Sequence, residues 1–166
     1  MAEILTERRD HRGMATIMAR KGIDAARIGT ALAIEAPTSP ACRRNAEGLI
    51  LLGTGPGNWL ASADNADPFW AERLRERLDG LASVSDQSGA YVGYRLSGEG
   101  ARTVLQRGLS IDLHPDAFGP GAALTSAIAH IGVVLWMVDA ASYDLALYRS
   151  YADSFHHWLH QMIDTL

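Results

Sequence analysis

The sequence IGVVLWMV, residues 131–138, decides how the rest of the chain is interpreted. Apolar side chains occupy both parities of this run. Val133 and Leu135 would point to one face of a strand, whereas Val134 and Trp136 would point to the other. A strand that is apolar on both faces is typical of the covered centre of a sheet. We therefore expect residues 131–138 to form a central strand of the hydrophobic core.

The residues that follow this run predict a hairpin and a helix. Residues 139–142 form a short polar connection to a second strand-like stretch, residues 143–148, and so short a connection favours antiparallel pairing. After residue 150 the period becomes helical. The apolar positions of this helix are Tyr151, Phe155, Trp158, Leu159, Met162 and Leu166. One apolar stripe predicts a helix that packs back on the sheet.

Earlier segments add further elements. The pattern predicts strands over residues 14–18, 48–52, 82–85 and 90–96, and helices with N-caps at Asp24, Asp67 and Ser97. With the antiparallel hairpin, this order predicts an α+β fold in which helices pack on an antiparallel or mixed sheet. Residues 1–12 mix both charges and are predicted to be an exposed arm, and residues 13–166 a single domain.

Composition excludes several classes of protein. The chain has 166 residues, 48% of them hydrophobic, which suffices for one sizeable core. A net charge of −4 gives no basic field for nucleic acid. The single cysteine, Cys42, cannot form an internal disulfide, and the polar first twelve residues lack an export signal. No apolar run approaches the roughly 20 residues of a membrane span. We expect a cytoplasmic protein with no membrane partner.

A glycine-rich stretch follows the strand predicted over residues 48–52. Gly53 to Asn58 reads GTGPGN, and glycines after a strand suggest a phosphate or dinucleotide cradle. The match is incomplete, because the third glycine of G-x-G-x-x-G falls at Asn58 and Pro56 removes an N–H donor. We favour a tight turn between a strand and a helix over a nucleotide site.

Histidines form the next candidate. His156 and His160 are one helical turn apart, and Asp153 and Asp164 lie near them, so a metal is conceivable on that face. The glutamate of H-E-x-x-H is missing, which favours a solvated or interface-forming face. His130 could act as a base, but a lone histidine is more often a structural, hydrogen-bonded residue.

Three weaker patterns complete the search for chemistry. Cys42 stands beside Arg43 and Arg44, which would lower a thiol pKa, but a bystander cysteine is favoured. The cluster of Arg8, Arg9 and Arg12 suggests a phosphate contact or, with acids interleaved, a solvated tail. A triad of Ser150, Asp153 and His157 lacks the G-x-S-x-G elbow. The residues therefore assign no catalytic, cofactor-binding or metal-binding position.

Three segments resemble the gamma subunit of heterotetrameric sarcosine oxidase. They are GLILLGTGPGNWL (48–60), LASVSDQSGAYVGYRLSGEGARTVLQRGLSIDLHPDAFGPG (81–121) and IAHIGVVLWMVDAASYDLALYRSYADSFHHWL (128–159). The resemblance implies a small subunit without a cofactor of its own. Its partners would be an alpha subunit with NAD and a folate-related region, a beta subunit with the flavins FAD and FMN, and a zinc-binding delta subunit. Such a complex demethylates sarcosine to glycine, produces hydrogen peroxide and passes the one-carbon unit to tetrahydrofolate.

The resemblance implies a non-catalytic subunit that stabilises an oxidoreductase complex, chiefly by packing on the alpha subunit. Two alternatives stay open. One is the corresponding subunit of a sister complex, such as N-methylglutamate dehydrogenase. The other is a free-standing folate-binding protein or folate-dependent enzyme, which would need carboxylates to orient its ligand.

A more distant resemblance addresses the second alternative. The strand, the S-G-x-x-A-R-x-x-L helix from Ser97 and the later strands are similar to the folate-binding domain of the glycine-cleavage aminomethyltransferases. Where those enzymes carry an acidic pair, a rough alignment on Gly132 places Leu135 and Trp136, and their asparagine falls near Arg149. The resemblance therefore implies a related fold that lacks this folate chemistry.

Overall fold

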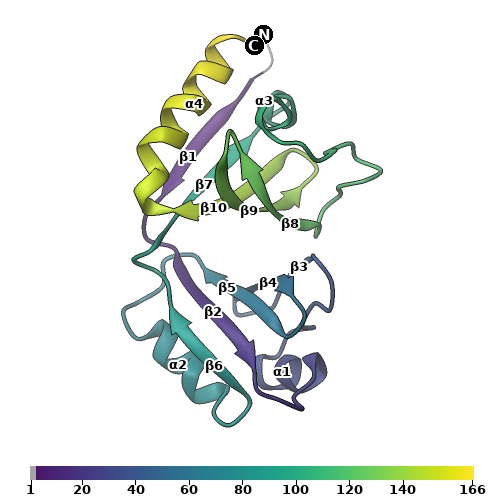
Figure 1. The fold of residues 1–166 in the computed structure, drawn as a ribbon, viewed down its shortest axis with the longest axis vertical. Coiled ribbons are helices and arrows are strands. Elements are labelled where there is room, and N and C mark those ends of the chain that lie inside the picture. The colour runs from purple at the N-terminus through teal and green to yellow at the C-terminus, as the bar shows by residue number, and fades with distance from the viewer. Residues whose placement is uncertain (1–2) are drawn as a thin grey trace. The chain divides into compact units, whose positions relative to one another are not determined.

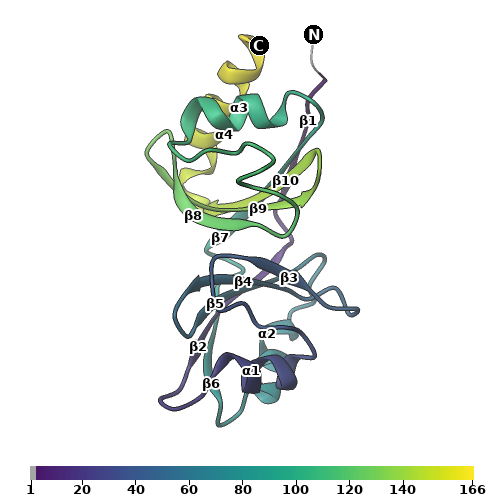
Figure 2. The ribbon, with the colours of Figure 1, turned by 90° about the vertical axis from the view of Figure 1, so that its right-hand side faces the viewer.

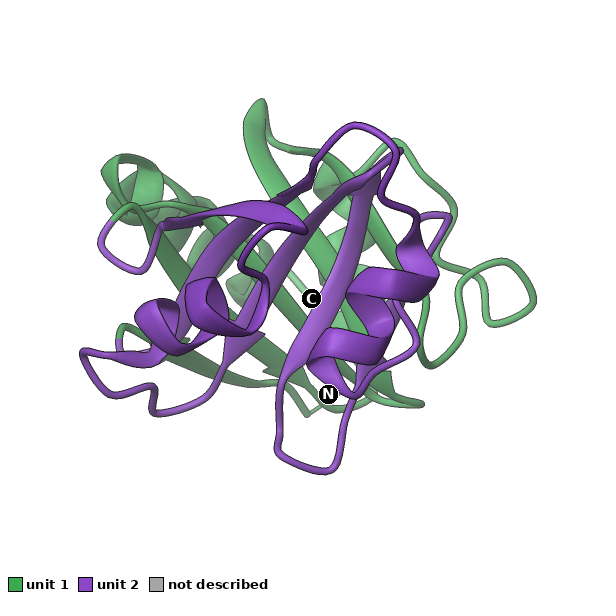
Figure 3. Ribbon diagram, turned by 90° about the horizontal axis from the view of Figure 1, so that it is seen from below, with its two compact units in different colours: residues 1–10, 90–166 green, residues 11–89 purple. Residues whose placement is uncertain are grey.

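The protein contains two antiparallel sheets, each with its own pair of helices. The computed structural model describes residues 3–166. Contacts within the chain define two compact units: residues 1–10 with 90–166 form unit 1, and residues 11–89 form unit 2 (Figure 3). The α+β class and the antiparallel sheet are thus confirmed.

Unit 1 holds the hairpin and the last helix that the sequence predicts. Its sheet has the order β1-β7-β10-β9-β8 (Figure 1). Its elements are β1 (Leu5–Arg9), β7 (Tyr91–Ser97), α3 (Ala101–Gly108), β8 (Ala123–Ile128), β9 (Ile131–Asp139), β10 (Ser142–Tyr148), the short 3-10 helix η1 (Arg149–Tyr151) and α4 (Ala152–Asp164). Residue Ser97 ends β7, and α3 begins only at Ala101 with Gly100 as its N-cap, so the predicted N-cap at Ser97 was wrong.

Helices α3 and α4 cover one face of the sheet of unit 1 (Figure 2). Leu135 and Met137 of β9 point to this face and join one buried cluster with Phe155 and Leu159 of α4. Gly108 allows close packing, because a Cβ there would lie 2.5 Å from the ring of Trp158. The last helix therefore packs back on the sheet, as its apolar stripe predicts.

Unit 2 has the sheet order β3-β4-β5-β2-β6. Its elements are β2 (Gly13–Ala19), α1 (Ala25–Leu32), β3 (Cys42–Arg44), β4 (Ile50–Gly55), β5 (Asn58–Ala63), α2 (Trp70–Arg77) and β6 (Ala82–Asp86). Helices α1 and α2 contribute to a single buried cluster with the sheet. The predicted N-cap of α1 is confirmed, since Asp24 Oδ1 accepts a hydrogen bond of 2.9 Å from the amide of Arg27.

The two sheets have the same strand order and the same strand directions. Strands β2, β3, β4, β5 and β6 of unit 2 correspond in order and direction to β7, β8, β9, β10 and β1 of unit 1. In unit 2 the last strand, β6, follows helix α2 in the sequence. In unit 1 the corresponding strand is β1, which comes from the other end of the chain.

The prediction that residues 1–12 form an exposed arm is wrong, because part of this segment is a strand of the sheet of unit 1. Leu5–Arg9 form a strand that pairs along its whole length with β7, although most of its side chains are exposed. Arg12 is 4% exposed, so its side chain is buried and is not part of a solvated tail. Residues 1 and 2 of the arm lie outside the described residues. Where a single domain over residues 13–166 was expected, the contacts define two units.

The turn between β8 and β9 is strained. It consists of Ala129 and His130, whose φ angles are 48° and 69°. Two-residue hairpin turns of type I′ have positive φ at both positions, which usually hold asparagine and glycine. The side chain of His130 is exposed.

Replacing His130 by glycine is expected to raise the free energy of unfolding by about 0.5 to 1 kcal/mol, because glycine adopts positive φ without the steric cost of a side chain. Urea unfolding of both proteins measures the difference. His130→Ala is the control, since it removes the imidazole but retains the Cβ. If the alanine variant gained as much stability as the glycine variant, backbone strain would not be the cause.

Candidate functional site

One row of residues crosses the sheet of unit 1 on the face that α3 and α4 do not cover. We call this the open face of the sheet because neither helix covers it, although Trp136 and Asp144 on this face are buried. In the strand register, Trp136 of β9 lies opposite Asp144 of β10, Asp144 opposite Arg95 of β7, and Arg95 opposite Glu7 of β1. These residues alternate with those of the buried cluster under the helices, which places their side chains on the open face.

Asp144 and Arg95 form a bidentate ion pair at the centre of this row. Arg95 Nε lies 2.6 Å from Asp144 Oδ1, and Nη2 lies 2.8 Å from Oδ2. The carboxylate is 0% exposed and the arginine side chain is 25% exposed. Parallel N–H bonds to both oxygens are the strongest form of this interaction. Because both carboxylate oxygens are engaged, Asp144 is poorly placed to act as a base or to orient a ligand.

Trp136 completes the apolar part of the row. It is 1% exposed, and its strand neighbours Leu135 and Met137 are buried under the helices on the opposite face. The prediction that β9 is a central strand buried on both faces is confirmed. A buried indole thus stands at the position where the resemblance to the aminomethyltransferases implies an acidic residue in those enzymes. The side chains present here do not fit the carboxylate set that such a folate site uses.

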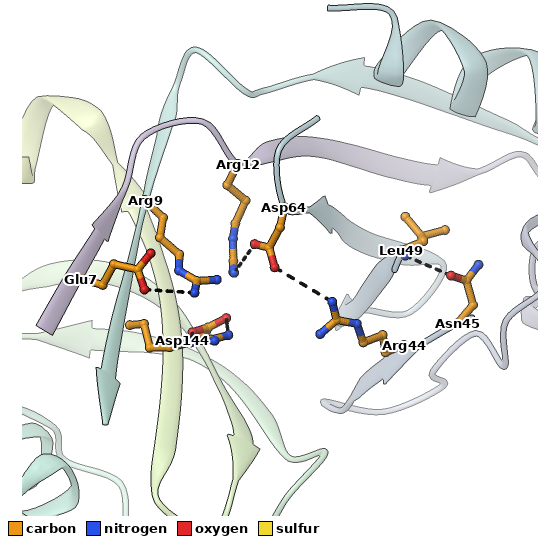
Figure 4. Close-up of polar contacts among 9 residues, drawn as sticks. Glu7, Arg9, Arg12, Arg44, Asn45, Leu49, Asp64 and Asp144 are labelled. Carbon is orange, nitrogen blue, oxygen red and sulfur yellow. Dashed lines mark hydrogen bonds and ion pairs between the residues drawn. The ribbon is translucent and has the colours of Figure 1, made fainter. Parts of the chain in front are cut away.

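The three arginines near the N-terminus each have an acidic partner, and Figure 4 shows those of Arg9 and Arg12. Arg8 bonds to Asp10 and Arg9 to Glu7, both at 3.1 Å. Hydrogen bonding to Arg8 is the main reason that the pKa of Asp10 lies below its usual value. In unit 2, Arg12 lies 2.8 Å and Arg44 4.0 Å from Asp64. These residues form local ion pairs and do not make a phosphate cluster.

The glycine-rich stretch is part of a β-hairpin. Gly53 to Gly55 end β4, and Pro56 and Gly57 form the turn to the antiparallel β5, so the predicted turn between a strand and a helix was wrong. No helix begins there to direct N–H groups at a phosphate, and the residues do not fit a dinucleotide cradle. Gly53 has a packing role instead, because a Cβ at this position would lie 2.3 Å from the carbonyl oxygen of Ser39.

The histidines of α4 lie close together. The ring centroids of His156 and His160 are 4.2 Å apart. Among residues 3–166, no group of three or more histidine, cysteine, aspartate or glutamate side chains is arranged to hold a metal ion. Two imidazoles without further ligands do not fill the four positions of a structural zinc site.

Elemental analysis provides a direct check of this helix face. Protein purified without a histidine tag is expected to contain well under one equivalent of zinc, because no third ligand joins His156 and His160 in the part of the chain that the structure describes. The control is the double variant His156→Ala and His160→Ala. A full equivalent of zinc in the wild type that disappears in the double variant would contradict the expectation.

The remaining candidates do not assemble into a site. Within the described residues, no hydrogen bond connects Ser150, Asp153 and His157. Cys42 begins β3 opposite Leu52 and is half-buried. No helix in residues 3–166 is both long and apolar enough to cross a bilayer.

Unit 2 has a hollow beside α2. Charged side chains line it together with Trp70, and these are Glu47, Asp64, Asp67, Arg73 and Arg77. The charges are paired: Arg73 bonds to both oxygens of Asp67, and Arg77 lies 3.0 Å from Glu47. Hydrogen bonding to Arg73 is the main cause that lowers the pKa of Asp67. With its charges paired, the hollow offers little to recognise a charged ligand.

Comparison with known proteins identifies the family. The model of the sarcosine oxidase, gamma subunit family matches residues 18–164. The chain belongs to this family. The sarcosine oxidase subunit gamma of Corynebacterium sp. (strain P-1) is 34% identical over 113 residues, 68% of this chain and 56% of that one. That of Arthrobacter sp is 32% identical over 114 residues, 69% of this chain and 56% of that one. This gamma-family chain thus spans little more than half the length of either relative.

Solved structures share the fold. A chain of the heterotetrameric sarcosine oxidase from Corynebacterium sp. U-96 superposes with a TM-score of 0.87 and 24% identity, covering 98% of this chain and 84% of that one. Aminomethyltransferase T of the glycine cleavage system from Bartonella henselae gives a TM-score of 0.66 and 16% identity, covering 95% and 45%. Both resemblances that the sequence suggests are therefore confirmed at the level of family and fold.

Inspection of the sequence missed the ion pair on the open face of this gamma-family chain. Asp144 interrupts the apolar stretch of β10, and Arg95 interrupts the alternation of β7. A charged residue at a buried parity is a signal that a partner lies on a neighbouring strand. The partner could not be named without the register, because β7 and β10 are separated by α3, β8 and β9.

Proposed function

We propose that this chain is the non-catalytic gamma subunit of a heterotetrameric sarcosine oxidase complex. Membership of the gamma subunit family carries the proposal. The fold similarity over 98% of the chain supports it, and the engaged carboxylate of Asp144 agrees with a supporting rather than a catalytic role. In this role the chain packs chiefly on the alpha subunit and stabilises the assembly in the cytoplasm.

The chemistry of the complex would reside on the other chains. Alpha, beta and delta subunits would carry NAD, FAD, FMN and zinc, and the complex would pass the one-carbon unit of sarcosine to tetrahydrofolate. Co-expression with and without this chain tests the proposal. We expect the four chains to purify together, and we expect the complex to lose stability or to assemble poorly when this chain is omitted. Full assembly and unchanged stability without it would contradict the proposal.

Two other functions remain to be distinguished. A sister complex that oxidises another N-methyl amino acid, such as N-methylglutamate, would use the same fold in this subunit. Activity of the purified complex with each substrate separates these cases. A free-standing folate-binding protein would instead bind tetrahydrofolate as an isolated chain, and the buried Trp136 argues against that function.

The isolated chain is expected to bind neither flavin nor NAD. The glycine-rich stretch is part of a β-hairpin without a helix start, so it lacks the N–H groups of a dinucleotide site. Absorbance of the purified protein detects a flavin, and calorimetric titration measures NAD binding. Stoichiometric yellow colour, or a dissociation constant near the micromolar range, would refute the expectation.

A further inference from the structure

The outer strands of the two sheets differ in their protection against pairing with another chain. Charged side chains discourage such pairing. Strand β1 carries Glu7, Arg8 and Arg9, β3 carries two arginines, and β6 ends in an aspartate. Strand β8 has the sequence ALTSAI, with neither a charge nor a proline. It is the outer strand with the least protection among those described.

The backbone of β8 offers unpaired groups along this edge. In an antiparallel pair, alternate residues turn their N–H and C=O groups toward the partner strand. The amide of Met137 donates a hydrogen bond of 3.0 Å to the carbonyl of Ala122, so the backbone groups of Ala122 point toward β9. The two-residue turn after Ile128 places the backbone groups of Ile128 toward β9 as well, and the residues between them alternate. The groups of Ala123 and Thr125 therefore point away from β9. Within residues 3–166, no backbone hydrogen bond reaches them from the outer side.

The side chains leave this edge accessible. Thr125 and Ala127 are exposed. Gly132 lies opposite Ala127 on β9, and a Cβ there would meet nothing within 4 Å. A single bridge between Leu109 and Ile128 limits the edge at one end. The accessible length is thus about five residues, roughly 17 Å of strand.

Charge indicates which partner would suit the edge. Unit 1, which comprises residues 1–10 and 90–166, holds ten acidic side chains and six arginines. Its net charge is therefore −4, equal to that of the whole chain. Residues 108–148 contain four aspartates and no lysine or arginine. A second copy would bring like charges together. A strand with neutral side chains and neighbouring lysines or arginines would be attracted.

We propose that the outer edge of β8 receives an extended segment of another subunit, which adds a strand to the sheet of unit 1. The segment is uncharged where it pairs with Ala123 to Ala127 and carries basic residues beside that stretch. Main-chain hydrogen bonds to Ala123 and Thr125 would supply affinity, as in other cases of strand addition. This inference rests on the proposed function, because the partner is a subunit of the same complex.

Two substitutions of Thr125 test the edge. Thr125→Lys adds the charge that protects other outer strands. Thr125→Pro removes an N–H that β9 does not use, so the hairpin should remain intact. Ser85→Lys, at an exposed position of β6, is the matched control. Each variant is co-expressed with the tagged alpha, beta and delta subunits, and the amount of this chain that co-purifies is measured.

We expect both Thr125 variants to co-purify at least tenfold less than the wild type, and Ser85→Lys to co-purify normally. Circular dichroism and melting verify that the variants fold. Amide hydrogen exchange of the wild type gives a second measurement: Ala123 and Thr125 should become protected only in the complex.

The outcomes separate the two proposals. Failure of the wild type to co-purify would refute the proposed function and the edge together. Normal co-purification of the Thr125 variants, or unchanged exchange at Ala123 and Thr125 in an intact complex, would refute the edge alone. Loss of a dimer of this chain in the Thr125 variants would assign the edge to a second copy and refute the proposal of another subunit.

Discussion

Replacing Asp144 by alanine is expected to lower the free energy of unfolding by about 3 kcal/mol or more. The change leaves the guanidinium of Arg95 without its bidentate partner on a largely buried face. Breaking a buried ion pair by removing one partner typically costs about 3 to 5 kcal/mol, because the remaining charge is poorly solvated. Denaturant unfolding of the wild type and the variant measures the cost.

A double variant separates the ion pair from simple packing. Arg95→Met with Asp144→Leu replaces both charges by apolar side chains of similar size, and such replacements are often neutral or stabilising. We expect the double variant to recover most of the stability lost in Asp144→Ala. If Asp144→Ala alone unfolded at the wild-type denaturant concentration, the pair would contribute nothing to stability.

Truncation of Trp136 to alanine is expected to cost roughly 3 to 5 kcal/mol, as other losses of a large core side chain do. The indole is 1% exposed on β9, between the paired positions Ala123 of β8 and Asp144 of β10. Thermal unfolding with and without tetrahydrofolate measures both the stability and any ligand binding. Phe69→Ala is a suitable control, because this ring is 70% exposed and its loss should change little.

The same experiment tests the free-standing folate-binding protein. If the open face held a working folate site, Trp136→Ala would mainly weaken binding. The variant would then melt like the wild type, and tetrahydrofolate would stabilise only the wild type. We expect the reverse: a large loss of stability and no folate effect on either protein.

Elements with strong local patterns could be predicted from the sequence. The run at residues 131–138 became β9, and the terminal helix and the N-cap of α1 at Asp24 also agree with the structure. In each case the deciding information lies within a few neighbouring residues. A two-sided apolar run, a helical stripe and a capping side chain depend little on the rest of the chain.

Outer strands could not be predicted in the same way. Leu5–Arg9 has four exposed residues of five, so it lacks the alternation by which a half-buried strand is recognised. Its strand structure depends on β7, a partner about ninety residues away. The hairpin at Gly53 to Asn58 was missed for a related reason, because β5 continues directly from its turn and glycines fit several kinds of turn.

In the candidate site, too, local sequence patterns predict some features, whereas others depend on distant parts of the chain. The burial of Trp136 follows from the local run, and the absence of a recognisable motif gave no catalytic assignment. The pairing of Asp144 with Arg95 depends on which strands are neighbours, and two residues 49 positions apart give no local signal. Likewise, the least protected outer strand became recognisable only when the order of the strands was known.

The origin of β1 has a consequence for the synthesis of the chain. Leu5 pairs with Ser97, so the first strand leaves the ribosome about ninety residues before its partner. At roughly 5 to 20 residues per second this delay lasts about 5 to 20 seconds. Residues 11–89 already contain all five strands of the sheet of unit 2 and can begin to pair during this time. Strand β1 cannot join its sheet until β7 has been synthesised. The exposed charges of β1 help to prevent aggregation during this time.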